Sequence, residues 1–394
     1  MGKFVRFAAL PHLDKYTKFE DIMSKEDRQE IEGLIKKIRA MWSADDMTPN
    51  QRLYGAATGG DVDHVPLTWV PPTEKVALEI GGDFVALYTD PVFNMKAMLT
   101  AVLKYQSEML VPFFALDQVM NDAYGTKVEY LPTTYPKVTE WAIKRGFEEI
   151  LENDVPDPRD SDSLKWQILT TNYLNQHLGD MSGISLNCTC GPYYTYSCML
   201  RGPINAMRDF KHHPDLAVQA LDKIYEYCLA VFKYMLKETG GQSYFNVESF
   251  VSPSFTPPAW FEKFCAPYER RLVQDMAPLP GSIGGGGQGT NDFTPILETL
   301  IDMGYTGLSV CTPTDLGKLK ELSATRGITV TYNALTGVDV RDSTPEQIHE
   351  KLKAILEIGK PGKKFFIGGD TCDEATPDEN IHAVREAVRK YGKY

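Results

Sequence analysis

The chain has no surplus of basic residues and no apolar run long enough to span a membrane. Its 41 lysines and arginines are outnumbered by 53 acidic residues, so the net charge is −12. Because phosphate binding needs a basic footprint, we expect neither nucleic acid nor an anionic membrane surface as a partner. The N-terminus also lacks an apolar signal segment, which favours a cytoplasmic location.

Cysteines are too few and too irregularly spaced for a disulfide framework, although the chain contains seven of them. This usage is typical of a reducing compartment. Cys198, Cys228 and Cys265 fall in expected helices, where a cysteine usually acts as a small hydrophobic residue. Cys311 and Cys372 instead follow expected strands, so packing and function are equally open for them.

Short apolar runs that alternate with helical stretches predict the fold. The expected strands are residues 65–69, 113–116, 184–187, 244–247, 279–283, 307–310, 328–332 and 364–367. Eight such units indicate an α/β fold, a (β/α)8 TIM barrel. Residues 47–394 form the expected barrel, and residues 1–46 an N-terminal extension with one helix over residues 24–42. Ser24 and Asp27 suit a capping box at its start.

One segment, residues 281–292, is unusually rich in glycine. Four consecutive glycines, Gly284 to Gly287, lose much backbone entropy on folding and bury no side chain. We therefore expect a loop at the barrel mouth that either is flexible or lets a large group approach, and both interpretations stay open. A phosphate-binding role is disfavoured because no Gly-Lys-Ser/Thr sequence follows.

Catalytic groups of a TIM barrel lie at the carboxyl ends of its strands. By this rule the polar side chains that end or follow strands are the candidates. The expected catalytic residues are Asp117, Glu248, Tyr332 and Asn333. Aromatic and amide side chains near the same ends could line a pocket, together with one histidine ahead of strand three: Tyr124, Tyr193, Tyr194, Tyr244, Asn246 and His177.

Carboxylates and thiols at strands four, six and eight could converge on one ion. Glu248, Cys311 and either Asp370 or Cys372 would give three ligands and an open position, the arrangement of a catalytic zinc site. The spacing alone does not select among these four. A carboxylate at a strand end can equally bind a backbone amide or an arginine.

Four separated segments resemble the uroporphyrinogen decarboxylase superfamily, in order along residues 47–394. The closing strand, loop and helix read GGDTCDEATPDENIHAVREAV, and the entry pattern reads MTPNQRLYGAATGGDVDHVPLTW. Between them, SCMLRGPINAMRDFKHHPDLAVQALDKIYEY and SPSFTPPAWFEKFCAPYERRLVQDM are similar to the middle helices. The resemblance implies the same TIM barrel.

Two motifs of the superfamily are missing. Members that transfer methyl groups to thiols hold zinc with a His-x-Cys at the end of strand five and a cysteine after strand eight. Here strand five runs into Ser282, Ile283 and glycines, and Asp370 takes the usual cysteine position, two residues before Cys372. The decarboxylase grips its substrate with arginines after the first strand, where this chain has Trp69 to Glu74 and no arginine.

The resemblance therefore favours the branch of corrinoid-dependent methyltransferases, O-demethylases among them. The implied reaction moves a methyl group from a small donor, preferably a methoxylated aromatic, to the cobalt of a separate corrinoid (cobalamin) protein. Zinc is a possible cofactor and a homodimer a possible assembly. Two alternatives stay open: a quaternary amine as the donor, and a non-catalytic barrel that binds a corrinoid or a pterin.

Overall fold

The computed structural model describes residues 13, 15–111, 122–182, 186–241, 243–247, 253–279, 282–286, 291–369 and 371–394. For residues 186–190, 243–245, 247 and 282 it describes the backbone only. No helix in these ranges is both long and apolar enough to cross a membrane.

A parallel sheet forms the centre of the molecule. Its strands follow the chain in order: β3 (Leu186–Cys190), β4 (Ser243–Val247), β5 (Ser282–Gly286), β6 (Gly307–Cys311), β7 (Thr329–Leu335) and β8 (Phe365–Gly369). Residues 65–69 lie alongside β8, because Leu67 forms a parallel bridge with Ile367 and the Thr68 amide donates to the Ile367 carbonyl at 2.7 Å. The predicted first strand thus continues the curved sheet, and the fold is the predicted TIM barrel. The run predicted at 113–116 lies outside the described residues.

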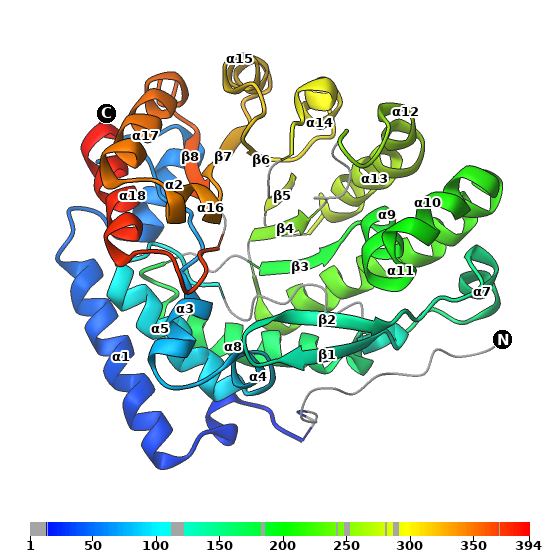
Figure 1. Cartoon of the computed structure of the whole chain (residues 1–394), viewed down its shortest axis with the longest axis horizontal. Coiled ribbons are helices and arrows are strands. Elements are labelled where there is room, and N and C mark those ends of the chain that lie inside the picture. Colours follow the sequence, from blue (N-terminus) through cyan, green and yellow to red (C-terminus); the bar gives the residue numbers. More distant parts are fainter. Residues whose placement is uncertain are drawn as a thin grey trace.

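Helices surround this sheet, as Figure 1 shows. They are α1 (Lys25–Ser43), α2 (Pro49–Thr58), α3 (Thr73–Glu79), α4 (Phe84–Thr89), α5 (Pro91–Tyr105), α7 (Phe147–Glu152), α8 (Asp162–Leu178), α9 (Pro192–Tyr194), α10 (Pro203–His212), α11 (Pro214–Thr239), α12 (Pro258–Trp260), α13 (Ala266–Met276), α14 (Leu297–Ile301), α15 (Leu316–Arg326), α16 (Gly337–Asp342), α17 (Pro345–Gly359) and α18 (Asp378–Tyr391).

The helix predicted for residues 24–42 is present as α1, with the expected cap. The Asp27 amide donates to the Ser24 hydroxyl at 3.0 Å, and the Ser24 amide donates to the Asp27 carboxylate at 3.1 Å. The buried side of α1, with Ile31, Ile38 and Trp42, packs into one hydrophobic cluster with α5 and α8. The extension is therefore held against the barrel by apolar burial.

An antiparallel hairpin, which the sequence analysis did not predict, is inserted ahead of α7. Its strands are β1 (Lys127–Leu131) and β2 (Thr134–Glu140). Most of its residues are exposed or half-buried. Polar and apolar residues alternate from Lys127 to Tyr130 in β1, but both faces of β2 carry charged or polar residues, so the period-2 signal for the hairpin is weak.

The glycine-rich segment is a strand up to Gly286, so the prediction of a loop across Gly284–Gly287 is wrong for the part that the structure describes. A Cβ atom on Gly285 would lie 2.4 Å from the Tyr305 ring, and one on Gly286 would lie 1.9 Å from the Ser309 carbonyl oxygen. Gly286 also has φ +134°. Glycine is required here because neighbouring groups approach the backbone closely, despite its entropic cost.

We expect Gly286→Ala to lower the free energy of unfolding by more than about 1 kcal/mol, since alanine is strained at positive φ and the Ser309 backbone cannot give way cheaply. Gly33→Ala in α1 is the matched control, because nothing lies within 4 Å of its added Cβ. That control is expected to stabilise the protein by about 0.5–1 kcal/mol. Urea unfolding of both variants measures the difference, and equal effects would contradict this reading of β5.

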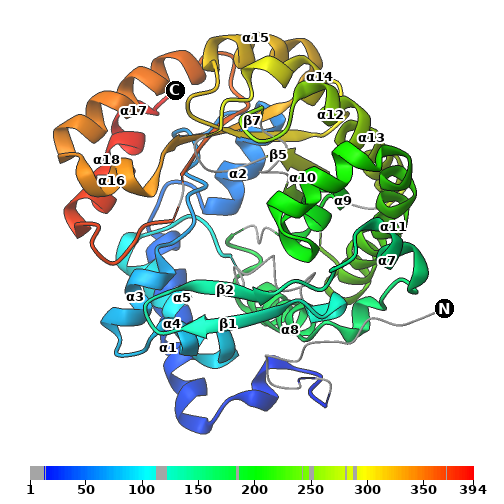
Figure 2. The same ribbon diagram turned by 45° about the vertical axis from the view of Figure 1, so that its right-hand side comes forward.

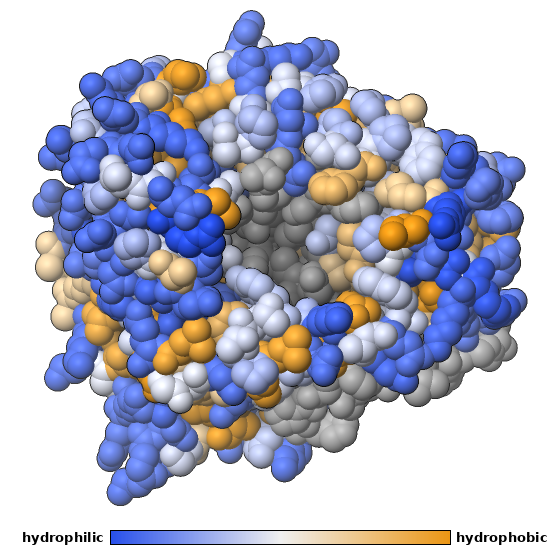
Figure 3. All heavy atoms as spheres, viewed as in Figure 1, coloured by the Kyte–Doolittle hydropathy of each residue, from blue (hydrophilic) through white to orange (hydrophobic). Residues whose placement is uncertain are grey.

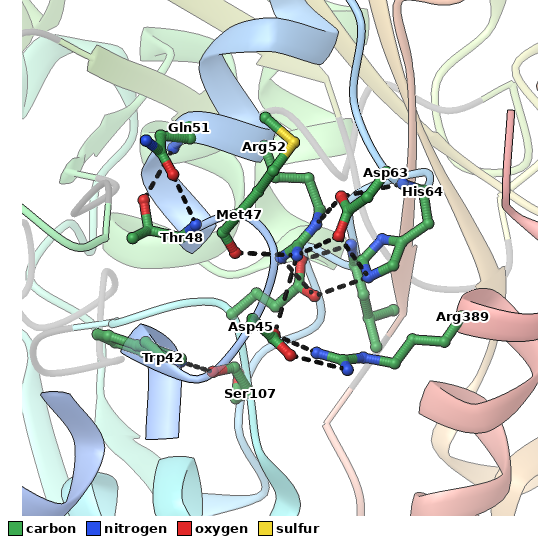
Figure 4. A network of polar contacts seen from close by, with 12 residues as sticks. Trp42, Asp45, Met47, Thr48, Gln51, Arg52, Asp63, His64, Ser107 and Arg389 are labelled. Atoms are coloured by element: carbon green, nitrogen blue, oxygen red, sulfur yellow. Dashed lines mark hydrogen bonds and ion pairs between the residues drawn. The ribbon is translucent and has the colours of Figure 1, made fainter. Parts of the chain in front are cut away.

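A buried ionic network closes the amino-terminal end of the barrel, opposite the strands' carboxyl ends (Figure 4). The fully buried Arg52 of α2 donates to the Asp63 carboxylate at 2.7 and 2.8 Å, and its Nη1 lies 3.1 Å from Glu108 Oε1. Asp45 pairs in turn with Arg389 of α18. These contacts give a structural reason for Arg52 and Asp63 in the entry pattern, and Gln51 completes the capping box of α2 with Thr48.

Candidate active site

The carboxyl ends of the strands gather at one face, which carries the hairpin and the loop after β8. Figure 3 shows this face hollowed near its centre. In TIM barrels the loops at this end build the active site. The described side chains around these strand ends are therefore the first candidates.

The sheet register identifies which side chains point into the barrel. Phe365 faces the helices, because Lys320 of α15 places its ammonium 5.4 Å from the Phe365 ring. Gly285 also faces outward, against Tyr305. Side chains alternate along a strand, and residues paired in register share a face. The register pairs Cys311 with Asn333 and Asn333 with Gly368, so these three residues face inward at one level.

Two predicted site residues, Cys311 and Asn333, are thus brought together. Asn333 is buried, and its Nδ2 donates to the Ser309 hydroxyl at 3.1 Å. The thiol of Cys311 contacts the Asn291 carbonyl at 3.6 Å. A Cβ atom on Gly368 would lie 2.2 Å from Asn333 Oδ1, so only glycine leaves room for this amide. The arrangement fixes the Asn333 side chain between β6 and β8.

Tyr332 and Asn246 point the other way, into the layer between barrel and helices. The Tyr332 hydroxyl donates to the Thr314 carbonyl at 2.9 Å, and Asn246 donates to Glu269 of α13 at 2.7 Å. Tyr332 precedes Asn333, so the two side chains must take opposite faces of β7. The prediction that Tyr332 and Asn246 face the barrel mouth is therefore wrong.

The predicted tyrosine lining is largely part of the core. Tyr124 packs edge-on against Tyr227 of α11, with 5.3 Å between ring centroids. The Tyr193 hydroxyl lies 3.0 Å from the Thr256 hydroxyl, and the residue is fully buried. Tyr194 is half-buried and packs against the same core cluster. Tyr124 and Tyr193 were predicted to line a pocket. They are instead buried in the core, so that prediction is wrong.

His177 lies far from the other candidates in the fold. It stands at the last turn of α8, a helix that precedes β3 and so ends near the strands' amino termini. Its ring lies 4.4 Å from the Tyr173 ring, and its carbonyl accepts from Arg39 of α1 at 2.8 Å. The predicted role in substrate binding is therefore wrong on position.

The remaining candidates cannot be placed. Asp117, Glu248 and Asp370 lie outside the described residues, as does the side chain of Tyr244. In the ranges that the structure covers, no three His, Cys, Asp or Glu side chains are grouped as metal ligands. Two of the four predicted ligands lie outside those ranges, so the metal site stays a prediction.

The loop after β8, residues 371–376, is held by several elements, and we call it the β8 loop. Within it, Thr376 donates to the Asp373 carboxylate at 3.0 Å, and Arg341 of α16 pairs with the same carboxylate at 2.9 Å. Lys75 of α3 donates to the Glu374 carbonyl at 3.1 Å. Cys372 is nearly fully buried. Contacts with α3 and α16 therefore limit how far its thiol can move.

Two buried acids that sequence reasoning did not select stand near the same end of the barrel. Glu74, just after the first strand, accepts from the Tyr88 hydroxyl at 3.0 Å, and its Oε2 has no hydrogen-bond partner. Burial raises the pKa of Glu74. Burial also raises the pKa of Asp122 to about 7, although Ser161 and the Ser163 amide donate to it. Burial depends on helices far away in sequence, so no local pattern predicts that either residue is buried.

Comparison with known proteins gives one family. The family model described as uroporphyrinogen decarboxylase (URO-D) matches residues 48–391. A methyltransferase from Methanosarcina mazei is similar in structure, with a TM-score of 0.74 and 21% sequence identity, over 88% of this chain and 99% of that one. A B12-independent methionine synthase from Shewanella sp. W3-18-1 has a TM-score of 0.44 and 14% identity, over 74% and 85% of the two chains. No curated protein sequence matches the chain.

Proposed function

Because the chain belongs to the uroporphyrinogen decarboxylase family, we propose that it is the kind of member that transfers methyl groups. The observation that carries the proposal is the structural similarity to the Methanosarcina methyltransferase, which extends over 99% of that protein's length. We further propose a methoxylated aromatic as the donor and the cobalt of a corrinoid protein as the acceptor.

Porphyrinogen decarboxylation fits poorly with the residues that follow the first strand. A tetrapyrrole with many carboxylates needs cationic partners there. This chain instead has Val70, two prolines, Thr73 and the buried acid Glu74. Within the whole chain the net charge of −12 adds to the mismatch. Methyl transfer from a small neutral or singly charged donor avoids this cost.

In the proposed reaction, the bond between the methyl carbon and the ether oxygen breaks. A bond forms between that carbon and cobalt, which is oxidised from Co(I) to Co(III), and the departing phenolate oxygen takes a proton. A zinc ion or an acid would assist that departure. Glu248, Cys311 and either Asp370 or Cys372 would hold zinc, since thiolates and carboxylates suit it and Cys311 faces into the barrel. Asn333, fixed beside Cys311, would orient the substrate.

The proposal is tested with free cob(I)alamin as the methyl acceptor and a methoxybenzoate as the donor. We expect absorbance of methylcobalamin to appear together with the demethylated phenol. Cys372→Ser and Asn333→Ala should each slow the reaction by at least ten-fold, as for a group that assists the leaving oxygen or the pose. Cys228→Ser in α11 is the matched control, because that thiol packs within the core.

Elemental analysis of the same preparations tests whether the protein binds zinc. About one zinc per chain, lost in Glu248→Ala, Cys311→Ser, Asp370→Ala or Cys372→Ser, would identify the ligands. Methyl transfer from glycine betaine but not from the methoxybenzoate would replace the donor by a quaternary amine. If neither donor reacts while corrinoid binding persists, the chain is a binding protein and the proposed activity is wrong.

A further inference from the structure

The hairpin of β1 and β2 forms an arm that reaches from α7 toward α4, as Figures 1 and 2 both show. Its turn is fixed on α4, because the Phe84 amide donates to the Pro132 carbonyl at 3.0 Å. At the start of β2, Tyr135 lies with its ring 5.9 Å from Phe84 and 6.3 Å from Tyr88, centroid to centroid. The arm therefore has a defined position at its far end.

From that position Tyr135 reaches the β8 loop. Its hydroxyl lies 3.0 Å from the Thr371 hydroxyl, although the two residues are 236 positions apart in sequence. About half of Tyr135 is exposed, 48% of the residue by area. Its placement is therefore due less to burial than to the aromatic contacts and to this one hydrogen bond.

Thr371 directly precedes Cys372, which lies three residues after the end of β8. The backbone of Thr371 is also closely packed, because a Cβ atom on Gly337 would lie 2.3 Å from its carbonyl oxygen. Arg341 and Lys75 hold the loop further along, at Asp373 and Glu374. Tyr135 thus supplies a side-chain anchor at the end of the loop next to Cys372.

We propose that Tyr135 is a positioning residue, which holds the β8 loop in the conformation that buries the Cys372 thiol, through its hydrogen bond with Thr371. The inference rests on the proposed function in one respect only, that the β8 loop belongs to the active site. The hairpin then controls the access of solvent and reagents to the Cys372 thiol. Such a residue acts through the loop and need not touch the substrate.

The test is the rate at which N-ethylmaleimide modifies each thiol of the intact protein, resolved by mass spectrometry of peptides. Loss of one hydrogen bond should make opening of the loop roughly five-fold more frequent. Tyr135→Phe is therefore expected to speed modification of Cys372 about five-fold and to leave Cys311, Cys228 and Cys265 unchanged. Tyr54→Phe, an exposed tyrosine of α2, is the control and should change no rate.

Variants of the partner residue separate positioning from general loosening. Thr371→Val should reproduce the effect of Tyr135→Phe, the double variant should add nothing further, and Thr371→Ser, which keeps the hydroxyl, should behave like the wild type. A rate for Cys372 that stays within two-fold, or an equal rise at all four thiols, would overturn the proposal. Because no methyl donor is used, failure of the methyl-transfer assay leaves this result unaffected.

Discussion

Replacing Arg52 by methionine is expected to lower the free energy of unfolding by about 3–5 kcal/mol, because the change leaves buried acidic groups without their cation. Arg52 is fully buried and contacts Asp63, Glu108 and the Met47 carbonyl. Methionine matches much of its volume, so the loss reports on charge rather than on a cavity. Urea unfolding at neutral pH is the measurement.

The position of these partners explains why one side chain matters so much. Asp63 leads into the first strand, Glu108 follows α5, and Asp45 connects the network to Arg389 of α18. Arg52 therefore joins the first strand to the last helix, where the barrel closes. Removal of the charge leaves Asp63 and Glu108 without their cation at the same time, whereas the hydrogen bond from the Val65 amide to the Gly392 carbonyl and the pair of Asp45 with Arg389 remain.

Two further variants sharpen the test. Arg52→Lys keeps the charge but not the two-pronged contact with Asp63, so it should recover only part of the stability. Arg159→Met removes an exposed ion pair with Asp157 and should cost no more than about 1 kcal/mol. If Arg52→Met costs as little as Arg159→Met, the network does not hold the barrel closed.

The sequence predicted the barrel well because its strands are apolar and its helices are regular. Strands six, seven and eight were placed within a few residues of β6, β7 and β8, and the capping box of α1 was recognised from Ser24 and Asp27. Strand five was displaced toward Leu279, because four glycines argue against a strand by propensity. Packing against Tyr305 and Ser309, far along the chain, overrides that propensity.

The site was predicted less well, since a strand end shows which residues are near the mouth but not which way they point. Cys311 and Asn333 face inward, whereas Tyr332, one position earlier on β7, contacts Thr314 on the outer side. A shift of one residue changes the face, and sequence reading places strands less finely than that. Tyr135 was not considered because its strand, β2, carries polar residues on both faces and a proline at its third position.

A second large effect is expected for Asp122, whose replacement by asparagine should stabilise the protein at neutral and alkaline pH. Asp122 is buried, one carboxylate oxygen accepts from Ser161 and from the Ser163 amide, and the other has no hydrogen-bond partner. Burial is the main reason that its pKa rises from 3.8 to about 7. Asparagine keeps an oxygen for the two donors and cannot ionise.

Proton binding determines whether the unfolding free energy rises or falls with pH. Between pH 3.8 and about 7 the folded protein keeps the proton that the unfolded chain has lost, so stability falls as the pH rises through this range and is level above it. The whole loss is of the order of 4 kcal/mol, of which about 2–3 kcal/mol falls between pH 5 and 8. The difference in unfolding free energy, Asp122→Asn minus wild type, should grow by that amount over this interval.

Asp27→Asn provides the opposite control. Its contacts with Lys96 and Ser24 lower the pKa of Asp27 to about 2, so stability from this carboxylate is present above pH 3.8 and is lost only as the pH falls toward 2. The corresponding difference for Asp27→Asn should therefore stay constant between pH 5 and 8. A constant difference for Asp122→Asn as well would mean that Asp122 is ionised in the folded protein, held by a cation or by water at its second oxygen.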